Sequence, residues 1–529
     1  MTTQAAEPSA KEMRLVIGAS SLGTVFEWYD FFIYGTLAAS GIIGRTFFPA
    51  GNEVLQALLA WAGFAVGFGF RPLGAILFGY LGDKLGRKYT FLVTITLMGV
   101  ATAGVGLVPS YAAIGIAAPV LIILLRICQG LALGGEYGGA AIYVAEHSSH
   151  GRAGFHTSFI QASVIGGFIL SIAVVLVCRF GMPLEIWNAW GWRVPFLFSI
   201  VLLAVSLWMR LKLSESPVFK AMKEAGETAK NPFVESFIYP GNRKRLFVAL
   251  FGIAAGLTVI WYTATFSVLS FLQGPMRLDA TAAQLITGGA AVIGIVFFIF
   301  FGHLSDRVGR KKPIVIGYAL TLVLLFPLFW VIGNAANPEL AAAARRAPVI
   351  VTGPHCGYDP FASVQPDECG KLLDYFSKKG VTYNTAKAPA VTVSIGGNPV
   401  NDTEPAALDA ALAAAGYQLD RVVPSGGNLV VIVLAILGLV ALSGATYGPV
   451  AALLSEMFPS RIRYSSMSIP YHIGTGYFGG FLPLISQLIV AKTGDPYAGL
   501  WYTFAVVALA LVVTVWGLEE TVAPKPVRR

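Results

Sequence analysis

The chain has 529 residues, of which 56% are hydrophobic and 12% are charged, and its formal net charge is +9. Soluble domains carry about 25% charged residues, so this composition excludes an ordinary soluble fold and predicts a polytopic membrane protein. The positive charge does not indicate a nucleic-acid partner, because the basic residues gather in alternate loops, as membrane topology requires.

Twelve apolar segments are long enough to cross a lipid bilayer as helices, since about 20 residues span its core. Their apolarity is continuous, which favours helices over an alternating β-barrel pattern. With residue 1 in the cytoplasm, most Lys and Arg fall on the cytoplasmic side, so we expect a bacterial inner-membrane protein with both termini cytoplasmic. The spans are predicted near 17–40, 55–80, 90–108, 114–140, 155–178, 194–210, 246–271, 283–302, 313–333, 428–448, 465–491 and 497–517.

The chain repeats itself. FGYLGDKLGRK (78–88) recurs as FGHLSDRVGRK (301–311), 223 residues later, whereas the loop motifs around Glu146 and Glu456 are 310 residues apart. The unequal spacing predicts two parallel six-helix bundles, an arrangement typical of secondary transporters, with an insertion between helices 9 and 10. The expected parts are a cytoplasmic tail (1–16), the first bundle (17–210), a cytoplasmic linker (211–245), helices 7–9 (246–334), the insertion (335–427), helices 10–12 (428–517) and a cytoplasmic tail (518–529).

The insertion is predicted to lie on the outer, periplasmic side. Cys356 and Cys369 fall within it, and in an oxidising compartment they are expected to form a disulfide rather than remain free thiols. KLLDYFSKKG and AALDAALAAAGY read as short helices and AVTVSIGG as a strand, so we expect a small folded domain.

Four stretches resemble the metabolite:proton symporter family of the major facilitator superfamily. They are FEWYDFFIYG (26–35), RPLGAILFGYLGDKLGRK (71–88), LLRICQGLALGGEYGG (124–139) and WGWRVPF (190–196). The resemblance implies an all-α fold of twelve transmembrane helices in two pseudo-equivalent bundles. It also implies proton-coupled transport of small organic acids, or of zwitterions such as proline and betaine. The insertion departs from the shorter family members.

Two acids lie within the first predicted span. Glu27 and Asp30 are three residues apart and therefore share a helix face, which Tyr34 extends. An intramembrane carboxylate is costly unless it faces a cavity or a partner, so both residues are candidate proton carriers. The alternative is that one of them is paired permanently with an arginine and joins two helices.

Two arginines lie at similar depth. Arg71 and Arg126 are candidates to hold an anionic substrate, because a guanidinium fits a carboxylate bidentately. The resemblance adds Gln129, since the superfamily's RxxQG pattern matches Arg126, Gln129 and Gly130 and is tied to proton coupling. Glu136 is a candidate proton relay. Structural bridges from Arg126 to Glu136, or from Arg71 to Asp30, are the alternative.

His472, Trp261 and Tyr262 complete the predicted substrate site, with Tyr34. A histidine within a span titrates near neutral pH when solvated, and aromatic side chains often line cavities between helices. Each of these residue types is also common in plain helix packing.

The repeated loop motif resembles the superfamily's loop between helices 2 and 3. Its acid can accept hydrogen bonds from a helix N-terminus, and such contacts break and reform as the halves rock. It is therefore predicted to be a gate. Its members are Gly79, Asp83, Gly86, Arg87 and Lys88, and in the second half Gly302, Asp306, Gly309 and Arg310, with Ser305 at the position of Gly82.

The sequence thus predicts a proton-coupled symporter that imports a small organic acid by alternating access and functions as a monomer. Uptake of a zwitterion is the first alternative, and a transporter-like sensor that uses the insertion is the second. No reactive constellation, metal-ligand cluster or phosphate-binding loop is apparent in the sequence, so neither an enzyme nor a cofactor or metal is expected.

Overall fold

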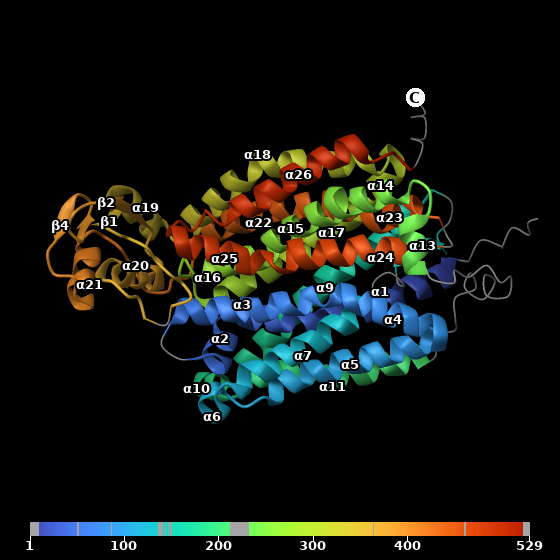
Figure 1. Ribbon diagram of the computed structural model, residues 1–529, viewed down its shortest axis with the longest axis horizontal. Coiled ribbons are helices and arrows are strands. Elements are labelled where there is room, and N and C mark those ends of the chain that lie inside the picture. The colour runs from blue at the N-terminus through green and yellow to red at the C-terminus, as the bar shows by residue number, and fades with distance from the viewer. Residues whose placement is uncertain are drawn as a thin grey trace, which may run out of the picture.

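The computed structural model describes residues 10–49, 52–85, 87–135, 141–142, 144–146, 148, 151–211, 232–362, 364–459 and 462–521. Long helices form an elongated bundle, and a small domain of strands and short helices lies at one end of it (Figure 1). We call this the insertion end. The opposite end, where the first helix begins and the last one finishes, is the terminal end.

The N-terminal half consists of six long helical segments joined by short helices. The long segments are α1 (Ala10–Ala39), α3 (Glu53–Gly69) continued by α4 (Arg71–Leu85), α5 (Arg87–Leu107), α7 (Ala117–Gly134), α9 (Ala153–Phe180) and α11 (Val194–Leu211). The short helices are α2 (Ile42–Phe47), α6 (Tyr111–Ile114), α10 (Leu184–Ala189) and the 3-10 turn η1 (Gly191–Arg193). The first helix is already formed at Ala10, before the predicted start of its span.

Glycines allow α7 to pack directly against the backbone of α3 and α4. A side chain at Gly130 would overlap the carbonyl of Gly67, and one at Gly134 would overlap the carbonyl of Arg71. Small residues permit this close approach in membrane helices. Gly130 and Gly134, which follow Arg126, therefore serve helix packing.

The C-terminal half begins after α13 (Pro232–Ile238) with a segment interrupted by two π-helical turns. It runs through α14 (Asn242–Phe247), η2 (Val248–Ala254), α15 (Ala255–Tyr262), η3 (Thr263–Ser267) and α16 (Val268–Gln273). The other segments are α17 (Ala280–Val308), α18 (Lys311–Ala336), α22 (Gly426–Tyr447) with α23 (Val450–Met457), α24 (Arg463–Ile473) with the π-turn η4 (Gly474–Gly480) and α25 (Leu482–Thr493), and α26 (Leu500–Gly517).

In the described part of the chain, twelve helical segments therefore traverse the bundle, six in each half, which confirms the predicted all-α fold of two six-helix bundles. Within the described ranges, ten of them are long and apolar enough to cross a membrane by length and composition alone. The remaining two are α1, which carries the buried acids, and α5, whose apolar stretch is shorter.

The two halves meet along α9 and α17, which pack side by side over much of their length (Figure 1). Gly302 of α17 lies against the carbonyl of Gly154 and the side chain of Ser158. Toward the insertion end, α3 packs against η4 and α25 of the other half.

Between α18 and α22, the chain folds into a separate α/β domain, here called the insertion domain (residues 338–421). Its four-stranded sheet has the order β2-β1-β3-β4; β1 and β2 are parallel, and the other neighbours are antiparallel. Cys356 and Cys369 form a disulfide. Its elements are α19 (Pro338–Arg346), β1 (Val349–Gly353), α20 (Glu368–Lys379), β2 (Tyr383–Lys387), β3 (Thr392–Ile395), β4 (Asn398–Val400) and α21 (Pro405–Ala414).

Candidate functional site

The two acids of α1 are buried near the middle of the N-terminal half. Glu27 is 7% exposed and Asp30 is 5% exposed. The Oδ1 atom of Asp30 has no hydrogen-bond partner within the described part of the chain. An ionised carboxylate that is not fully hydrogen-bonded is costly to bury, by several kcal/mol in protein interiors. The charge state of Asp30 therefore affects how stable this packed arrangement is.

Arg126 of α7 is enclosed by backbone carbonyls and aromatic rings. Its guanidinium donates to the carbonyls of Gly63 (3.3 Å), Phe31 (3.4 Å) and Phe64 (3.4 Å), and lies over the rings of Phe31 (4.1 Å) and Tyr34 (4.5 Å). None of the ion pairs found among the described residues involves Arg126. Its charge is met by carbonyl dipoles and ring faces instead.

Gln129 connects Arg126 to α5 and α1. Its side-chain oxygen accepts from Arg126 at 2.6 Å, and its amide donates to Thr102 Oγ1 at 2.7 Å. Gln129 and Thr102 also each donate to the backbone carbonyl of Asp30 at 3.4 Å. Three predicted residues, Asp30, Arg126 and Gln129, thus come together, and Thr102 was missed because a lone threonine in an apolar span carries no distinctive signal.

Arg71 begins α4 and reaches across the boundary between the halves. Its side chain is fully buried, and its guanidinium lies over the rings of Trp28 (5.1 Å) and Phe68 (5.2 Å). Its Nη1 donates to Thr475 Oγ1 of η4 at 3.3 Å. A cation from the N-terminal half therefore contacts a hydroxyl group of the C-terminal half inside the bundle.

A group of polar side chains surrounds Thr475. Thr475 donates to the carbonyl of Tyr471 at 2.8 Å, and the hydroxyls of Tyr447 and Tyr471 are 2.7 Å apart. His472 is fully buried beside the ring of Tyr471. The prediction included His472 but not Thr475, whose position is signalled only by the interruption of an apolar segment by IGTG.

Aromatic rings fill the middle of the boundary between the halves. Phe32 of α1 stacks on Trp261 of α15, with ring centroids 5.1 Å apart. Tyr262 and Phe266 contact Phe64 across the same boundary, at 6.2 and 5.3 Å. Trp261 and Tyr262 thus lie at the contact between the bundles, whereas the predicted residue Tyr34 packs on Arg126 inside the N-terminal half.

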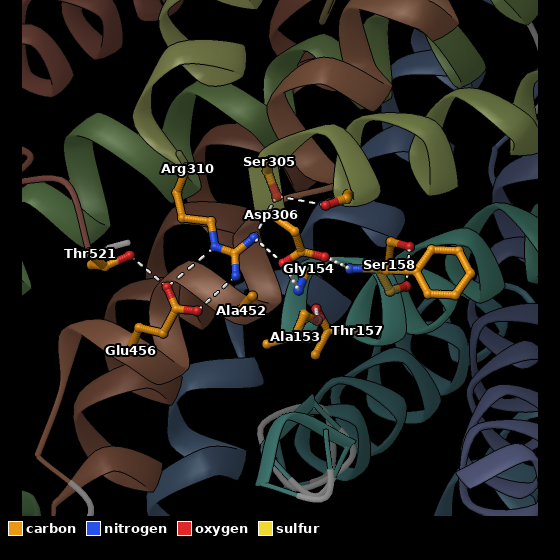
Figure 2. Close-up of polar contacts among 12 residues, drawn as sticks. Ala153, Gly154, Thr157, Ser158, Ser305, Asp306, Arg310, Ala452, Glu456 and Thr521 are labelled. Atoms are coloured by element: carbon orange, nitrogen blue, oxygen red, sulfur yellow. Dashed lines mark hydrogen bonds and ion pairs between the residues drawn. The ribbon is translucent and has the colours of Figure 1, made fainter. Parts of the chain in front are cut away.

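At the terminal end, the second copy of the loop motif joins the halves (Figure 2). Asp306 accepts hydrogen bonds from the backbone nitrogens of Gly154 and Phe155, both at 2.8 Å, where α9 begins. Arg310 donates to Asp306 at 2.7 Å and to Glu456 at 2.9 Å. The carboxylate at the positive end of α9 is favourable electrostatically.

We call the contact of Asp306 with the start of α9, together with Arg310 and Glu456, the latch. Further bonds and close contacts fix the residues around it. Arg310 also donates to Ser305 Oγ at 2.7 Å, and the backbone nitrogen of Arg310 donates to Glu520 at 2.7 Å. Gly309 has φ +94° and lies against Glu520, so a side chain there would be strained. Gly302 allows α17 to approach α9.

The first copy of the motif is described less fully. Gly79 lies in α4, and Gly86 lies outside the described residues. Nothing is described of the side chains of Asp83, Arg87 and Lys88. The predicted proton relay Glu136 also lies outside the described residues. In the second copy, Asp306 accepts hydrogen bonds from a helix N-terminus, as the sequence predicted for the acid of this motif. Arg463 of α24 in the C-terminal half pairs with Glu146 of the N-terminal half at 3.0 Å, which is an ion pair between the halves.

Two helical bundles with a buried cation at their boundary, Arg71, and with charged side chains that join them at one end are typical of a secondary transporter of the membrane. Residues 20–353 match the sequence profile of the Major Facilitator Superfamily. The chain belongs to this superfamily.

Relatives and solved structures agree with this assignment. The shikimate transporter of Escherichia coli K12 is 36% identical over 60% of this chain and 72% of its own length. A proline/betaine transporter of Salmonella typhimurium LT2 is 35% identical over 67% of this chain and 71% of its own. The xylose transporter XylE of E. coli, in a partially occluded inward-open conformation, has the same fold, with a TM-score of 0.57, 17% identity and coverage of 97% and 99%. These relatives are transporters, not enzymes.

Proposed function

We propose that this protein is a proton-coupled symporter that imports a small organic acid, and that Arg71 binds the substrate's carboxylate. The proposal rests on the hydrogen bond from Arg71 to Thr475, because this bond shows a buried cation in contact with the opposite half. The two halves are expected to move relative to each other during transport. A guanidinium binds a carboxylate bidentately, and a substrate that replaces this contact would be held by both halves.

Arg126 suits a different role. Backbone carbonyls, Gln129 and aromatic rings already surround its guanidinium, so a substrate anion would have to displace several contacts to reach it. We assign Arg126, Gln129 and Tyr34 to holding α7 against α1. His472, Tyr447 and Tyr471 would supply hydrogen-bonding groups from the C-terminal half.

Proton coupling is assigned to the acids of α1. Asp30 lies in a closed site where adding or removing a proton changes the cost of burial, and Glu27 lies one turn away on the same helix. Protonation would then influence which end of the transporter is open. Glu136 remains a candidate relay from its sequence position.

We assign the protein to a bacterial inner membrane and propose its orientation from the charge distribution along the sequence. Basic residues such as Arg243, Lys244 and Lys311 lie at the terminal end, which we assign to the cytoplasm together with both chain termini. The insertion domain then faces the periplasm, where its disulfide is stable. We expect a monomer to be sufficient for transport.

The test is uptake by purified protein in liposomes under an imposed inward proton gradient, with labelled shikimate and other small acids. The Arg71→Gln variant should lose accumulation, and Arg71→Lys should retain part of it. Arg193→Gln is the matched control, since Arg193 donates to the carbonyls of Gly106 and Val108 within the N-terminal half. Normal accumulation by Arg71→Gln would refute the role of Arg71, and gradient-independent uptake would refute proton coupling.

A zwitterion is the second candidate substrate. Trp261 and Phe32 stack at the boundary between the halves, and Tyr262 lies beside them. Aromatic faces bind quaternary ammonium groups by cation–π interaction, and the proline/betaine relative fits this chemistry. In the same liposomes, accumulation of betaine but not of any acid, abolished by Trp261→Leu, would favour this alternative.

A further inference from the structure

The insertion domain is attached firmly to the C-terminal half. Val422, just after the domain, donates its backbone N–H to Arg277 at 3.0 Å and accepts from Asp279 at 2.9 Å, in the connection between α16 and α17. Arg421 donates to two backbone carbonyls of the same region. Ala491 of α25 belongs to the apolar core of the domain. The domain therefore moves with the C-terminal half.

The same domain also reaches the N-terminal half, at the first turn of α3. Asn52 caps α3, and its side-chain nitrogen donates to the carbonyl of Ala362 in the insertion domain at 3.0 Å. Val54 packs against the domain's apolar core. Burial lowers the pKa of Arg277, as does the nearby Arg421, while Asp420 and Glu53 of α3 oppose this shift. A hydrogen bond and an apolar contact thus join α3 to the insertion domain, and the charge of Glu53 acts on Arg277 of the C-terminal half.

The part of the domain that contacts Asn52 is held at both ends. Ala362 lies between Cys356 and Cys369, which are linked by the disulfide. Gln365 donates to the carbonyl of Asp359 at 2.7 Å and accepts from its N–H at 3.1 Å, which links the residues on either side of Ala362. A braced loop can hold a neighbouring helix end in place, because little chain entropy is lost on contact.

We propose that the insertion domain is a clamp that holds the insertion end closed by binding the first turn of α3. Opening of that end moves α3 away from the C-terminal half, so the contacts of Asn52 and Val54 must then break. The inference rests on movement of the two halves during transport, but it does not depend on which substrate is carried.

Spin labels measure this opening without a substrate. One label replaces Glu185 of α10 in the N-terminal half and the other replaces Lys387 of the insertion domain; both positions are exposed, and Cys128 and Cys178 are changed to Ala. The test variant is Asn52→Ser, because serine caps a helix as well as asparagine but is too short to reach Ala362. The matched control, Asp279→Ser, changes the cap of α17 within the C-terminal half.

Molecules whose insertion end is open have the longer distance between the two labels, and closed molecules have the shorter one. Asn52→Ser is expected to raise the ratio of the longer-distance to the shorter-distance population about fivefold, because one hydrogen bond is lost. Asp279→Ser should leave the ratio unchanged. An unaltered ratio in Asn52→Ser, or an equal change in both variants, would overturn the clamp. Since the measurement requires no transport, a failure of the proposed substrate assignment would leave it intact.

Cross-linking provides an independent test. Asn52→Cys and Ala362→Cys are joined with a short bismaleimide, and the distance is read from fluorescent reporters attached at positions 185 and 387 by non-cysteine chemistry. The cross-link should eliminate the longer-distance population. A cross-link between Lys379→Cys and Asp409→Cys lies entirely within the domain and should have no effect. Opening that persists with residues 52 and 362 joined would overturn the proposal.

Discussion

Replacing Asp306 by Asn should weaken closure of the terminal end. Asp306 is 6% exposed and accepts hydrogen bonds from Gly154 and Phe155 at the start of α9, and from Arg310. Asparagine offers one oxygen and presents an NH₂ group that cannot accept. At least one backbone N–H of the other half therefore loses its partner, while Arg310 keeps Glu456.

The magnitude follows from these contacts. A hydrogen bond to a charged group contributes about 1.5–3 kcal/mol, so we expect closure to be weakened by about 2–3 kcal/mol. This corresponds to a change of about 30- to 150-fold in the ratio of closed to open molecules. The change acts on the contact between the halves, because Gly154 and Phe155 belong to the first half and Asp306 to the second.

The assay measures distances between spin labels at Leu211 of α11 and Arg245 of α14, one in each half. The Asp306→Asn variant should shift the distribution toward the separated state. Glu519→Gln is the matched control: it removes an ion pair with Lys244 at the same end, but both side chains are exposed, at 85% and 52%. Such surface pairs contribute little. If Asp306→Asn and the control give the same distribution as the unmodified protein, the latch is not what holds this end closed.

Three further outcomes are expected. Asp30→Asn should abolish gradient-driven accumulation in liposomes while substrate exchange continues, and normal accumulation would remove Asp30 from proton coupling. The double change Cys356→Ala with Cys369→Ala opens a short loop and should lower the stability of the insertion domain by about 3 kcal/mol, measured by thermal unfolding; an unchanged melting temperature would contradict this. Gly154→Ala should impair uptake, because its Cβ would overlap α17, whereas Gly289→Ala has open space and should be tolerated; equal uptake by the two variants would argue against close packing there.

The insertion domain shows how far local sequence signals extend. The segments read as short helices correspond to α20 and α21, and the segment read as a strand contains β3. These elements have strong local patterns. The parallel pairing of β1 with β2, and the contact of Ala362 with Asn52, depend on residues far apart in the chain, and no local pattern encodes them.

In the candidate site, too, some features follow from local sequence and others depend on packing. The sequence indicated Arg71 and Arg126 equally, because both are cations at membrane depth. Their surroundings distinguish them: Arg126 lies among carbonyls of α1 and α3, while Arg71 contacts Thr475, 404 residues later. Whether such a cation contacts its own half or the other half is decided by packing.

The sequence alone determined that the chain is a membrane protein of twelve helices in two repeated halves, since hydropathy and repetition are carried by the order of residues. Tertiary structure decided which polar groups meet. Asp306 reaches the start of α9 across about 150 residues, and Arg71 reaches η4 across the boundary between the bundles. Such contacts form only when separate helices are brought together, because burial of their apolar faces, not the polar groups themselves, fixes where the helices lie.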